Sequence, residues 1–345
     1  MDKPPGELRL MRAIGTDVVA ATVTYGDRFD TVCRRTVESV LEEGVFRLLV
    51  VDNGSVEASA RAMDEFAAEE PRVTILRNGS NEGSASAFRA AMIWASGTDA
   101  DLVWLLDDDN AVDPGTLAAL IDARAAASIS PNDNVIVTPR RIPNALHERV
   151  ASGIPIELVY PRPGAFLGFD ILALMWRRLR RRGAMNGDKT RVVEVPYAPY
   201  GGLLIPRELL RLRRLPDTRL QLYADDTVWT SGLVRSGHRI LLVLDIVIAD
   251  AEGKWTQAQQ GNSLTNSLRS PRRDRLYLST RNRVFFDHQS LSGVGSRLRY
   301  LLNRSTVMLF AMISALRYCE RDGLRIFLTA VRDAERGDFS RTVAL

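Results

Sequence analysis

The chain is poor in the residues that build disulfide frameworks, zinc clusters and membrane spans. Only two of its 345 residues are cysteines, Cys33 and Cys319, and their wide separation argues against a disulfide framework or a zinc site. The longest apolar stretch, 306–316, is far shorter than the roughly 20 residues that cross a bilayer. The charged segment 1–17 has no apolar core of a secretory signal. We therefore expect a cytoplasmic protein without a membrane span.

Histidines and dinucleotide-binding glycines are scarce as well. The three histidines, His147, His238 and His288, are isolated from one another, so we assign each of them a structural role. No G-x-G-x-x-G motif follows the first predicted strand, which leads into 24–27. A nicotinamide or flavin enzyme is therefore disfavoured.

Strand-like and helix-like segments alternate over residues 18–107. The β-branched and apolar segments that predict strands are 18–24, 48–52, 73–76 and 102–107. The segments with apolar residues at helical spacing are 29–41, 58–68 and 84–95. This order predicts an α/β fold with a mostly parallel sheet, right-handed crossovers and a ligand site at the carboxyl ends of the strands.

Three carboxylates, Asp107, Asp108 and Asp109, follow the fourth predicted strand directly. Adjacent carboxylates repel one another, and a hard divalent cation with bound phosphates would offset that repulsion. The alternative is a solvated acidic turn that caps the helix beginning near residues 113–114. Asp52 ends the second predicted strand at the same sheet edge, where it could accept hydrogen bonds from a base or a ribose. An Asx turn that closes this strand is the alternative for Asp52.

Four motifs, in this order along the chain, resemble glycosyltransferase family 2, and most closely its galactofuranosyl- and rhamnosyltransferase branch. They are Val23-Thr24-Tyr25-Gly26, Val51-Asp52-Asn53-Gly54-Ser55, 81–88 and Trp104-Leu105-Leu106-Asp107-Asp108-Asp109. The resemblance covers about residues 15–285 and implies a GT-A fold, a Rossmann-like, mostly parallel sheet with helices on both faces. It implies a catalytic domain over 1–255, with a nucleotide-binding part at 15–110 and an acceptor part at 111–255. A helical extension is expected over 256–345.

The resemblance also implies roles for individual residues in this first part of the chain. The nucleotide and donor sugar would be held by Thr24, Tyr25, Gly26, Asp52, Asn53, Asn81, Gly83, Asp107 and Asp108. In a DxD motif of this kind, Asp107 and Asp109 would bind Mn²⁺ or Mg²⁺ on the donor diphosphate. The chain departs from the branch at 84–87, where the branch has more glycine.

A second acidic pair, Asp225 and Asp226, precedes a helix-like segment. Inverting sugar transfer needs a general base, and the family pattern makes Asp226 the predicted base and Asp225 its alternative. Either residue could instead serve as a helix N-cap. Asp250 follows 24 positions after Asp226 (250 − 226), where such enzymes often place a third metal ligand. A carboxylate suits Mn²⁺ or Mg²⁺, and a surface turn is the alternative.

Aromatic residues and adjacent glycines indicate where the acceptor binds. Glycines allow close backbone approach and sugars stack on aromatic rings, so Tyr200, Gly201, Gly202 and Trp229 are the predicted acceptor-binding residues. A tight turn that enters a strand is the alternative for the glycines. A later element that the branch shares, 277–282, includes an arginine that could contact a phosphate.

Two segments bear on membranes. The apolar stretch 166–176 precedes an arginine run at 177–182, a pattern that can lie on an anionic bilayer or end an ordinary helix. Residues 296–336 have a pattern that predicts helices. These helices could pack on the catalytic domain, face a membrane or pair with a second copy of the chain. We expect a peripheral protein at the cytoplasmic face of the membrane with no nucleic-acid partner, and we leave self-association open.

The expected activity is an inverting, metal-dependent glycosyl transfer from a nucleoside diphosphate sugar. UDP-galactofuranose is the favoured donor and dTDP-rhamnose the next. The expected acceptor is a hydroxyl of a cell-surface or cell-wall glycan that is linked to polyprenyl diphosphate. One alternative, a sugar-nucleotide pyrophosphorylase, would need a glycine-rich loop at 24–28, where one glycine occurs. The other is a non-catalytic glycan-binding protein, against which the two acidic clusters argue.

Overall fold

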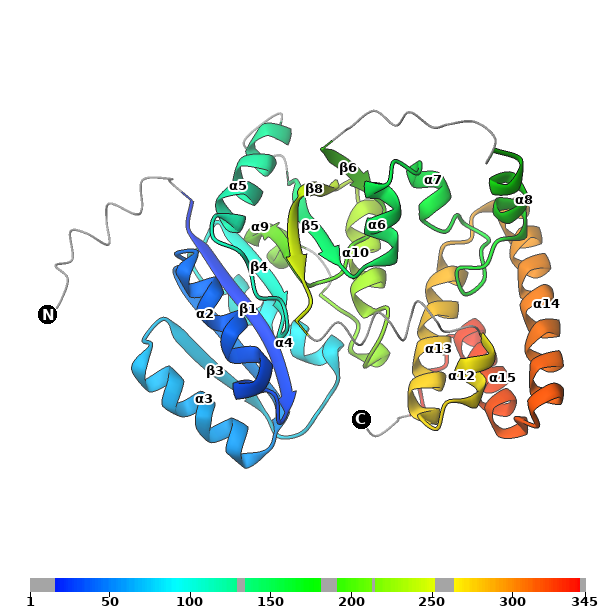
Figure 1. The fold of residues 1–345 in the computed structure, drawn as a ribbon, viewed down its shortest axis with the longest axis horizontal. Helices are drawn as coiled ribbons and strands as arrows, with labels where there is room; N and C mark the ends of the chain where they lie inside the picture. The colour runs from blue at the N-terminus through cyan, green and yellow to red at the C-terminus, as the bar shows by residue number, and fades with distance from the viewer. Residues whose placement is uncertain (1–15, 129–133, 181–190, 213–214, 252–263, 342–345) are drawn as a thin grey trace, which may run out of the picture. The chain divides into compact units, whose positions relative to one another are not determined.

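The computed structural model describes residues 16–128, 134–180, 191–212, 215–251 and 264–341. The chain divides into two compact units that are each discontinuous in sequence (Figure 1). The first unit comprises 1–143, 191–217 and 229–253, and the second comprises 144–190, 218–228 and 254–345.

The first unit is built on one eight-stranded mixed sheet with the order β3-β2-β1-β4-β7-β5-β8-β6. The strands are β1 (Val18–Gly26), β2 (Arg47–Ser55), β3 (Val73–Asn78), β4 (Leu102–Asp107), β5 (Ile136–Ile142), β6 (Val192–Val195), β7 (Leu203–Pro206) and β8 (Ile240–Ala249). β6 and β7 run antiparallel to their neighbours, and the other strands are parallel to one another. The predicted α/β class with a mostly parallel sheet is therefore confirmed.

Each predicted strand of the first 107 residues is present. β1, β2 and β4 are apolar runs that the sheet buries on both faces, whereas β3, at the edge of the sheet, is only partly buried. The register of β1 with β4 pairs Val18 with Leu102 and Val23 with Asp107. The carboxyl ends of β1, β2, β4, β5 and β8 consequently lie along one edge of the sheet. β7 is antiparallel, so its first residues lie at that same edge.

Helices cover both faces of this sheet. α2 (Arg34–Glu42), α3 (Glu57–Glu69) and α5 (Thr116–Ala127) share one core with alternate residues of the strands. α4 (Ser84–Ser96) contacts β1 and β2 through the other face and packs against α9 (Arg207–Leu212).

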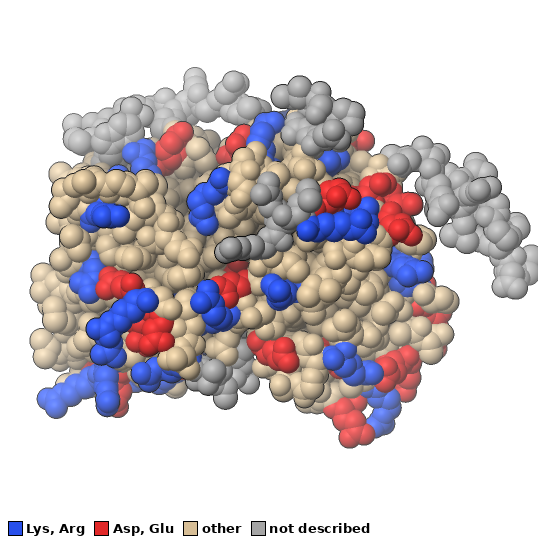
Figure 2. Space-filling view, turned by 180° about the vertical axis from the view of Figure 1, so that it is seen from behind, with Lys and Arg blue, Asp and Glu red and all other residues tan. Residues whose placement is uncertain are grey.

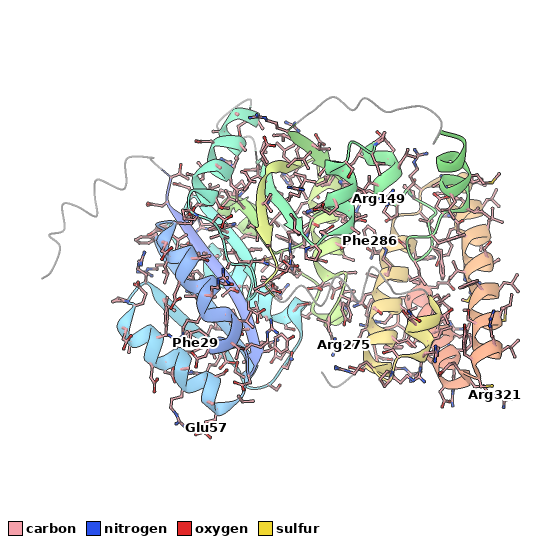
Figure 3. The ribbon with its side chains drawn as sticks, viewed as in Figure 1. Phe29, Glu57, Arg149, Arg275, Phe286 and Arg321 are labelled. Carbon is pink, nitrogen blue, oxygen red and sulfur yellow. The ribbon has the colours of Figure 1, made fainter. Side chains whose placement is uncertain are left out.

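The predicted helix at 29–41 is present, but its first turn is a π-helical turn, η2 (Phe29–Cys33). The carbonyl of Arg28 accepts hydrogen bonds from both Val32 and Cys33, which widens the turn before α2 begins. Phe29, labelled in Figure 3, lies in this turn with its ring 5.9 Å from the ring of Phe66 on α3.

The second unit is helical among its described residues. Its elements are α6 (Ala145–Ala151), α7 (Ile156–Val159), α8 (Ile171–Arg180), η3 (Thr218–Leu220), α12 (Leu264–Arg269), α13 (Arg273–Gln289), α14 (Gly293–Tyr318) and α15 (Arg321–Arg336). Phe166, Tyr300 and Phe327 lie in their shared core. α10 (Asp225–Arg235) has its first residues in this unit and the others in the first unit.

α8 begins later than the apolar pattern from residue 166 indicates. Asp170 caps the helix by accepting hydrogen bonds from the backbone of Leu172 and Ala173, while Phe166 is buried in the core before it. Of the arginine run that follows, the side chains at 177–182 lie outside the described residues. None of the described helices is both long and apolar enough to cross a membrane.

Charged residues of both signs are mixed on the surface of the described part of the chain. On the face shown in Figure 2, Lys and Arg alternate with Asp and Glu instead of forming one large area of either sign. Helical pairs such as Arg34 with Asp30 and Arg61 with Glu57 are typical of this surface. Exposed pairs of this kind contribute little to stability.

Candidate functional site

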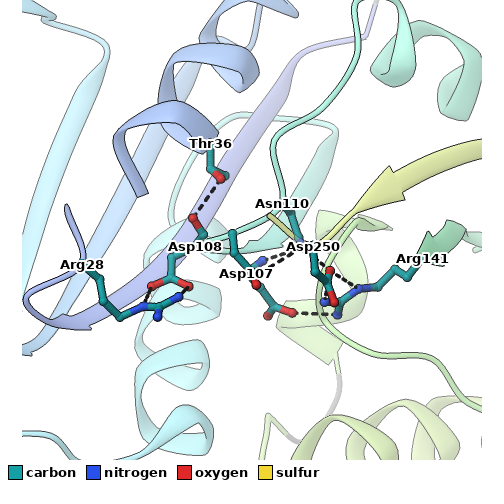
Figure 4. Close-up of polar contacts among 8 residues, drawn as sticks. Arg28, Thr36, Asp107, Asp108, Asn110, Arg141 and Asp250 are labelled. Carbon is teal, nitrogen blue, oxygen red and sulfur yellow. Dashed lines mark hydrogen bonds and ion pairs between the residues drawn. The ribbon is translucent and has the colours of Figure 1, made fainter. Parts of the chain in front are cut away.

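An acidic cluster lies at the carboxyl edge of the first unit's sheet, around one buried arginine (Figure 4). Asp107 ends β4, Arg141 lies near the end of β5, and Asp250 follows β8. Arg141 Nη1 lies 2.7 Å from Asp107 Oδ2, and Arg141 Nη2 lies 2.6 Å from Asp250 Oδ1. Three strand ends are therefore joined through one guanidinium group.

Asn110 and backbone contacts hold this cluster together. The Asn110 amide donates to Asp250 Oδ1 at 2.9 Å, and Asn110 Oδ1 accepts from the Asp107 backbone N–H at 2.9 Å. The Ala251 N–H donates to the Asp109 carbonyl at 2.8 Å. The turn after β8 is thus fixed onto the turn after β4, so the structure brings Asp250 beside the acidic triplet. Its service as a metal ligand remains a prediction.

Asp109 has a strongly perturbed carboxyl group. Burial, and then repulsion by the carboxylates of Asp107, Asp250 and Asp108, raises the pKa of Asp109 to about 7, against the opposing effect of Arg141. Burial also raises the pKa of Asp250, although Arg141 counteracts it. The cluster therefore carries more negative charge than one guanidinium group balances.

Asp108 faces a different part of the first unit. Arg28 donates two hydrogen bonds to its carboxylate, at 2.7 and 2.9 Å, and the Thr24 hydroxyl donates a third at 3.1 Å. The Thr36 hydroxyl donates to the Asp108 carbonyl at 2.9 Å (Figure 4). Burial raises the pKa of Asp108, and Arg28 opposes that rise. In this structure Asp108 fastens β1 and α2 to β4, and its predicted contact with a ribose is untested.

The other predicted residues at the end of β1 surround the same arginine. The guanidinium group of Arg28 lies over the ring of Tyr25, 5.2 Å from the ring centroid. Gly26 has a φ of +59°, which turns the chain away from β1. Tyr25 is partly exposed beside the buried pair.

Asp52 is buried near the end of β2. Its Oδ1 accepts a hydrogen bond from the Ser55 N–H at 2.8 Å, and its Oδ2 forms an ion pair with Arg77 Nε at 3.3 Å. β2 continues to Ser55, so Asp52 lies within the strand and its carboxylate bonds the last residue of that strand. A nucleoside contact through the same carboxylate stays a prediction.

Asn53 fixes the loop that contains two other predicted donor-binding residues. Its amide donates to Asn81 Oδ1 at 3.0 Å, and its Oδ1 accepts from the Glu82 N–H at 3.1 Å. Asn81 Oδ1 also accepts from the Gly83 N–H, directly before α4 begins. A Cβ on Gly54, whose φ is +82°, would lie 2.5 Å from the Asn81 nitrogen, so this contact requires glycine. The network places the loop 81–83 against the end of β2.

The two predicted acceptor glycines approach the acidic cluster and β5 closely. A Cβ at Gly201 would overlap Asn110 Oδ1 and lie 2.5 Å from Arg141 Nη1 and 2.7 Å from Asp107 Oδ2. Gly202 has a φ of +87°, and a Cβ there would lie 2.6 Å from Pro139 Cγ. The glycine pair thus lets the turn before β7 pass directly over the cluster.

The two aromatic residues predicted to stack on the acceptor are buried. The Tyr200 ring lies 4.2 Å from the Phe88 ring and 5.9 Å from the Trp229 ring, measured between centroids. Tyr200 is 4% exposed and Trp229 is 6% exposed. The structure therefore gives these rings a packing role behind the glycines, and stacking on a sugar is untested.

Asp225 and Asp226 are the first two residues of α10. Asp226 Oδ1 accepts hydrogen bonds from the backbone and the hydroxyl of Thr227, at 2.5 and 3.1 Å. Carboxylates are favourable in the first turn of a helix. These two residues are counted with the second unit, so the role of Asp226 as base toward the acidic cluster of the first unit stays a prediction.

Sequence reasoning missed Arg28, Asn110 and Arg141. Arg141 is the next-to-last residue of β5, at the ligand edge of the sheet. Asp52 and Asp107 were predicted because they are polar residues at the ends of strands, and the same reasoning could have identified Arg141. Arg28 had no such signal, because its partner is 80 positions away. Arg281, which was expected to contact a phosphate, is buried and donates to the carbonyls of Arg219 and Leu220.

The chemistry of the cluster fits a divalent cation. Asp107, Asp109 and Asp250 offer hard oxygen donors, and burial together with repulsion by neighbouring carboxylates raises the pKa of Asp109. As the side chains lie, no group of three His, Cys, Asp or Glu residues in the described part of the chain is arranged to hold a metal ion. Arg141 instead supplies the positive charge between Asp107 and Asp250.

Solved structures that are similar to this chain include the following three, none of them more than 18% identical to it. One is GalNAc-T7 with UDP, GalNAc and Mn²⁺, at 18% identity and a TM-score of 0.49, covering 68% of this chain and 44% of that chain. The chain thus spans less than half of that protein. Another is the mannosyltransferase PcManGT from Pyrobaculum calidifontis in complex with GDP-Man and Mn²⁺, at 14% identity and a TM-score of 0.49, covering 94% and 87%. A third is S. aureus TarS 1-349, at 12% identity and a TM-score of 0.45, covering 95% and 94%.

The chain has no match among curated proteins. The model of Glycosyl transferase family 2 matches residues 21–172. This segment contains the ends of β1, β2, β4 and β5, and hence Asp52, Asp107 and Arg141, whereas Asp226 and Asp250 lie beyond it. The matched segment is less than half of the chain, and it shows a resemblance to this family over residues 21–172.

Proposed function

We propose that this protein is a metal-dependent glycosyltransferase that uses a nucleoside diphosphate sugar as donor. The observation that carries the proposal is the acidic cluster at the ligand edge of the sheet, whose triplet lies inside the segment that matches glycosyl transferase family 2. Carboxylates at this edge are placed where open α/β sheets bind their ligands.

The donor nucleoside would lie along the ends of β1 and β2. Thr24, Tyr25 and Gly26 form the end of β1, and Asp52 is the carboxylate at the end of β2. Asn53, Asn81 and Gly83 hold the adjoining loop in a single arrangement through their hydrogen bonds. Such a prepared surface binds a ligand with a smaller loss of conformational entropy.

The donor diphosphate would lie at the acidic cluster. Asp107, Asp109 and Asp250 would hold Mn²⁺ or Mg²⁺, and Asp108 would support them from the buried side through Arg28. The bound cation would stabilise the negative charge that develops on the leaving nucleoside diphosphate. Arg141 adds a fixed guanidinium group, which binds phosphate oxygens well, at the same place.

Sugar transfer would proceed with inversion. Asp226, or Asp225 in its place, would take the proton from the acceptor hydroxyl as its oxygen attacks the anomeric carbon from the side opposite the diphosphate. Gly201 and Gly202 bring the turn before β7 against the cluster, with Tyr200 and Trp229 packed behind them, and the acceptor would lie beside this turn.

The four motifs shared with the galactofuranosyl- and rhamnosyltransferase branch favour UDP-galactofuranose as donor, followed by dTDP-rhamnose. The proposed acceptor is a cell-surface or cell-wall glycan linked to polyprenyl diphosphate. The protein would act at the cytoplasmic face of a membrane, which it would contact through residues 166–182 or through the C-terminal helices.

A donor screen tests the proposal. The purified protein is incubated with Mn²⁺, a panel of nucleotide sugars and a lipid-linked glycan acceptor, and release of nucleoside diphosphate is measured. We expect release with one donor, and no release when EDTA removes the cation. Absence of turnover and of binding for every donor would refute the glycosyltransferase proposal.

The Asp226→Asn variant tests the assignment of the base. We expect its kcat to fall by about 10²–10⁴-fold, the usual contribution of general base catalysis, with UDP affinity unchanged. The matched control is Glu57→Gln, an exposed acid on α3 (Figure 3). An equal loss of UDP affinity and of turnover would remove Asp226 from the role of base.

A further inference from the structure

Helix α14 of the second unit presents apolar side chains to solvent in two groups, one on either side of the exposed Ser305. The face consists of Val294, Leu298, Leu301, Leu302, Leu309, Phe310, Met312, Ile313 and Leu316. Val294 is 74% exposed and Leu316, near the other end of the helix, is 80% exposed. Figure 3 shows side chains of α14 that point away from α13 and α15. We call this set the α14 face.

Apolar residues occur on both sides of α14, on the side that packs in the core and on the α14 face. The opposite side of α14 is already packed into the core of the unit through Tyr300, Val307 and Ala311. A helix of 26 residues is about 39 Å long at 1.5 Å per residue, and the face extends along most of it. Soluble monomers rarely expose an apolar area of this length, which marks an interaction surface.

Exposed apolar residues of α8 adjoin the α14 face. Asp170, the cap of α8, forms an ion pair with Arg299 of α14 at 2.5 Å. The Ile171 N–H donates to Asn303 Oδ1 at 3.0 Å, which holds the start of α8 against the middle of α14. Leu172, Leu174 and Met175 of α8 are 44–58% exposed. Both helices of this joined pair therefore expose apolar side chains.

The charges of α14 indicate what covers this surface. The helix contains four arginines and no Asp or Glu. Arg299 and Arg304 form ion pairs within the unit, with Asp170 and Glu335. Arg297 and Arg317 are exposed near the two ends of the α14 face. Apolar residues flanked by arginines, without carboxylates, are typical of helices that lie in the interface of an anionic bilayer.

A second copy of the chain is a poorer occupant. In a twofold pairing of two α14 faces, an antiparallel arrangement would bring Arg297 near Arg317 of the other copy, and a parallel one would bring each arginine near itself. Neither arrangement supplies a carboxylate from α14 to these arginines. Anionic lipid headgroups would supply the missing negative charge along the whole helix.

We propose that the α14 face, together with the exposed end of α8, docks on the surface of an anionic lipid bilayer. The helix lies in the plane of the headgroups with its apolar side chains inserted and Arg297 and Arg317 on lipid phosphates. This docking rests on the membrane location in the proposed function, for which it names the contacting surface. It does not require sugar transfer. Vesicle binding without donor or metal therefore tests it separately.

The experiment is co-sedimentation of the full-length protein with vesicles of phosphatidylcholine, with or without phosphatidylglycerol. We expect binding that is stronger with phosphatidylglycerol. The triple variant Leu301→Gln, Leu309→Gln, Ile313→Gln should bind at least about tenfold more weakly, because it loses three aliphatic side chains that would insert into the bilayer. The control triple variant Phe46→Gln, Val56→Gln, Ile93→Gln removes equally exposed apolar residues from the first unit and should bind like the wild type.

A second variant tests the role of charge. Replacing Arg297 and Arg317 by Gln should weaken binding to phosphatidylglycerol vesicles by about fivefold per arginine, and should leave binding to phosphatidylcholine unchanged. Circular dichroism and light scattering accompany each variant. The proposal is overturned if the wild type binds neither vesicle, if both triple variants bind equally, or if the wild type is a dimer that the α14 triple variant dissociates. In each case a positive donor screen would leave the proposed enzyme activity intact.

Discussion

Replacing Asp109 by Asn should stabilise the metal-free protein at the cost of its proposed metal binding. Burial, and then the repulsion by neighbouring carboxylates described above, raises the pKa of Asp109 from 3.8 to about 7. For an acid whose pKa is raised by folding, the stabilising contribution is complete below the unfolded pKa and is lost as the pH rises to the folded pKa. The charged Asp109 therefore destabilises the protein progressively between about pH 4 and pH 7.

The pKa rise sets the magnitude. At 1.36 kcal/mol per pH unit, a rise from 3.8 to about 7 corresponds to at most about 4 kcal/mol at pH 8 and roughly half as much at pH 5.5. Solvent screening of a partly exposed carboxylate reduces these values, so we expect Asp109→Asn to stabilise by about 1–3 kcal/mol at pH 8. Asn keeps the oxygen that accepts from the Asn110 amide in the wild type, at 3.3 Å.

Urea unfolding in EDTA, followed by tryptophan fluorescence, measures this effect. Trp104 is fully buried on β4, in the same sheet as the cluster, and reports on its unfolding. The control is Asp122→Asn, an exposed residue of α5. With Mn²⁺ added, the wild type should gain stability by mass action and the variant should gain less. A variant that is less stable than the wild type at pH 8, or one whose effect is the same at pH 5.5, would refute the reasoning.

Two further predictions concern the surroundings of the cluster. Arg28→Met leaves the buried Asp108 carboxylate without its bidentate partner and should cost about 3–5 kcal/mol of unfolding free energy, while Arg28→Met with Asp108→Asn should recover part of it. Urea titration of both variants gives their free energies of unfolding. An Arg28→Met variant as stable as the wild type would contradict the prediction. Gly201→Ala places a Cβ against Arg141 and Asp107 and should weaken Mn²⁺ binding, measured calorimetrically, at least about tenfold. Gly295→Ala, where a Cβ meets nothing within 4 Å, is its control, and equal Mn²⁺ affinities would show that the close approach is irrelevant.

The sheet and its ligand edge could be predicted from the sequence because their signals are local. A buried parallel strand is a short apolar run, and the polar residues that follow it must emerge at the edge where ligands bind. Val18–Gly26 and Leu102–Asp107 both follow this rule. The segment 203–206 is also an apolar run, but its antiparallel direction depends on its neighbours in the sheet.

The arrangement within the candidate site could not be predicted, because it depends on contacts between distant segments. Three consecutive aspartates look equivalent in sequence, yet Asp108 faces Arg28 while Asp107 faces Arg141. Tyr200 was expected at the acceptor, but Phe88 lies against it and buries it. An aromatic ring next to glycines carries no sequence signal that distinguishes stacking on a sugar from packing on another ring.

The joining of Asp107 to Asp250 through Arg141 also orders events during synthesis. Asp250 leaves the ribosome 143 residues after Asp107 (250 − 107), so the triplet exists for much of translation without this partner. Contacts over such a separation form only after a large loop has closed. A truncated product that ends before β8 would keep the strand ends for a nucleoside but lack the complete cluster. Such a fragment would also lack the strand that pairs with β5 in parallel.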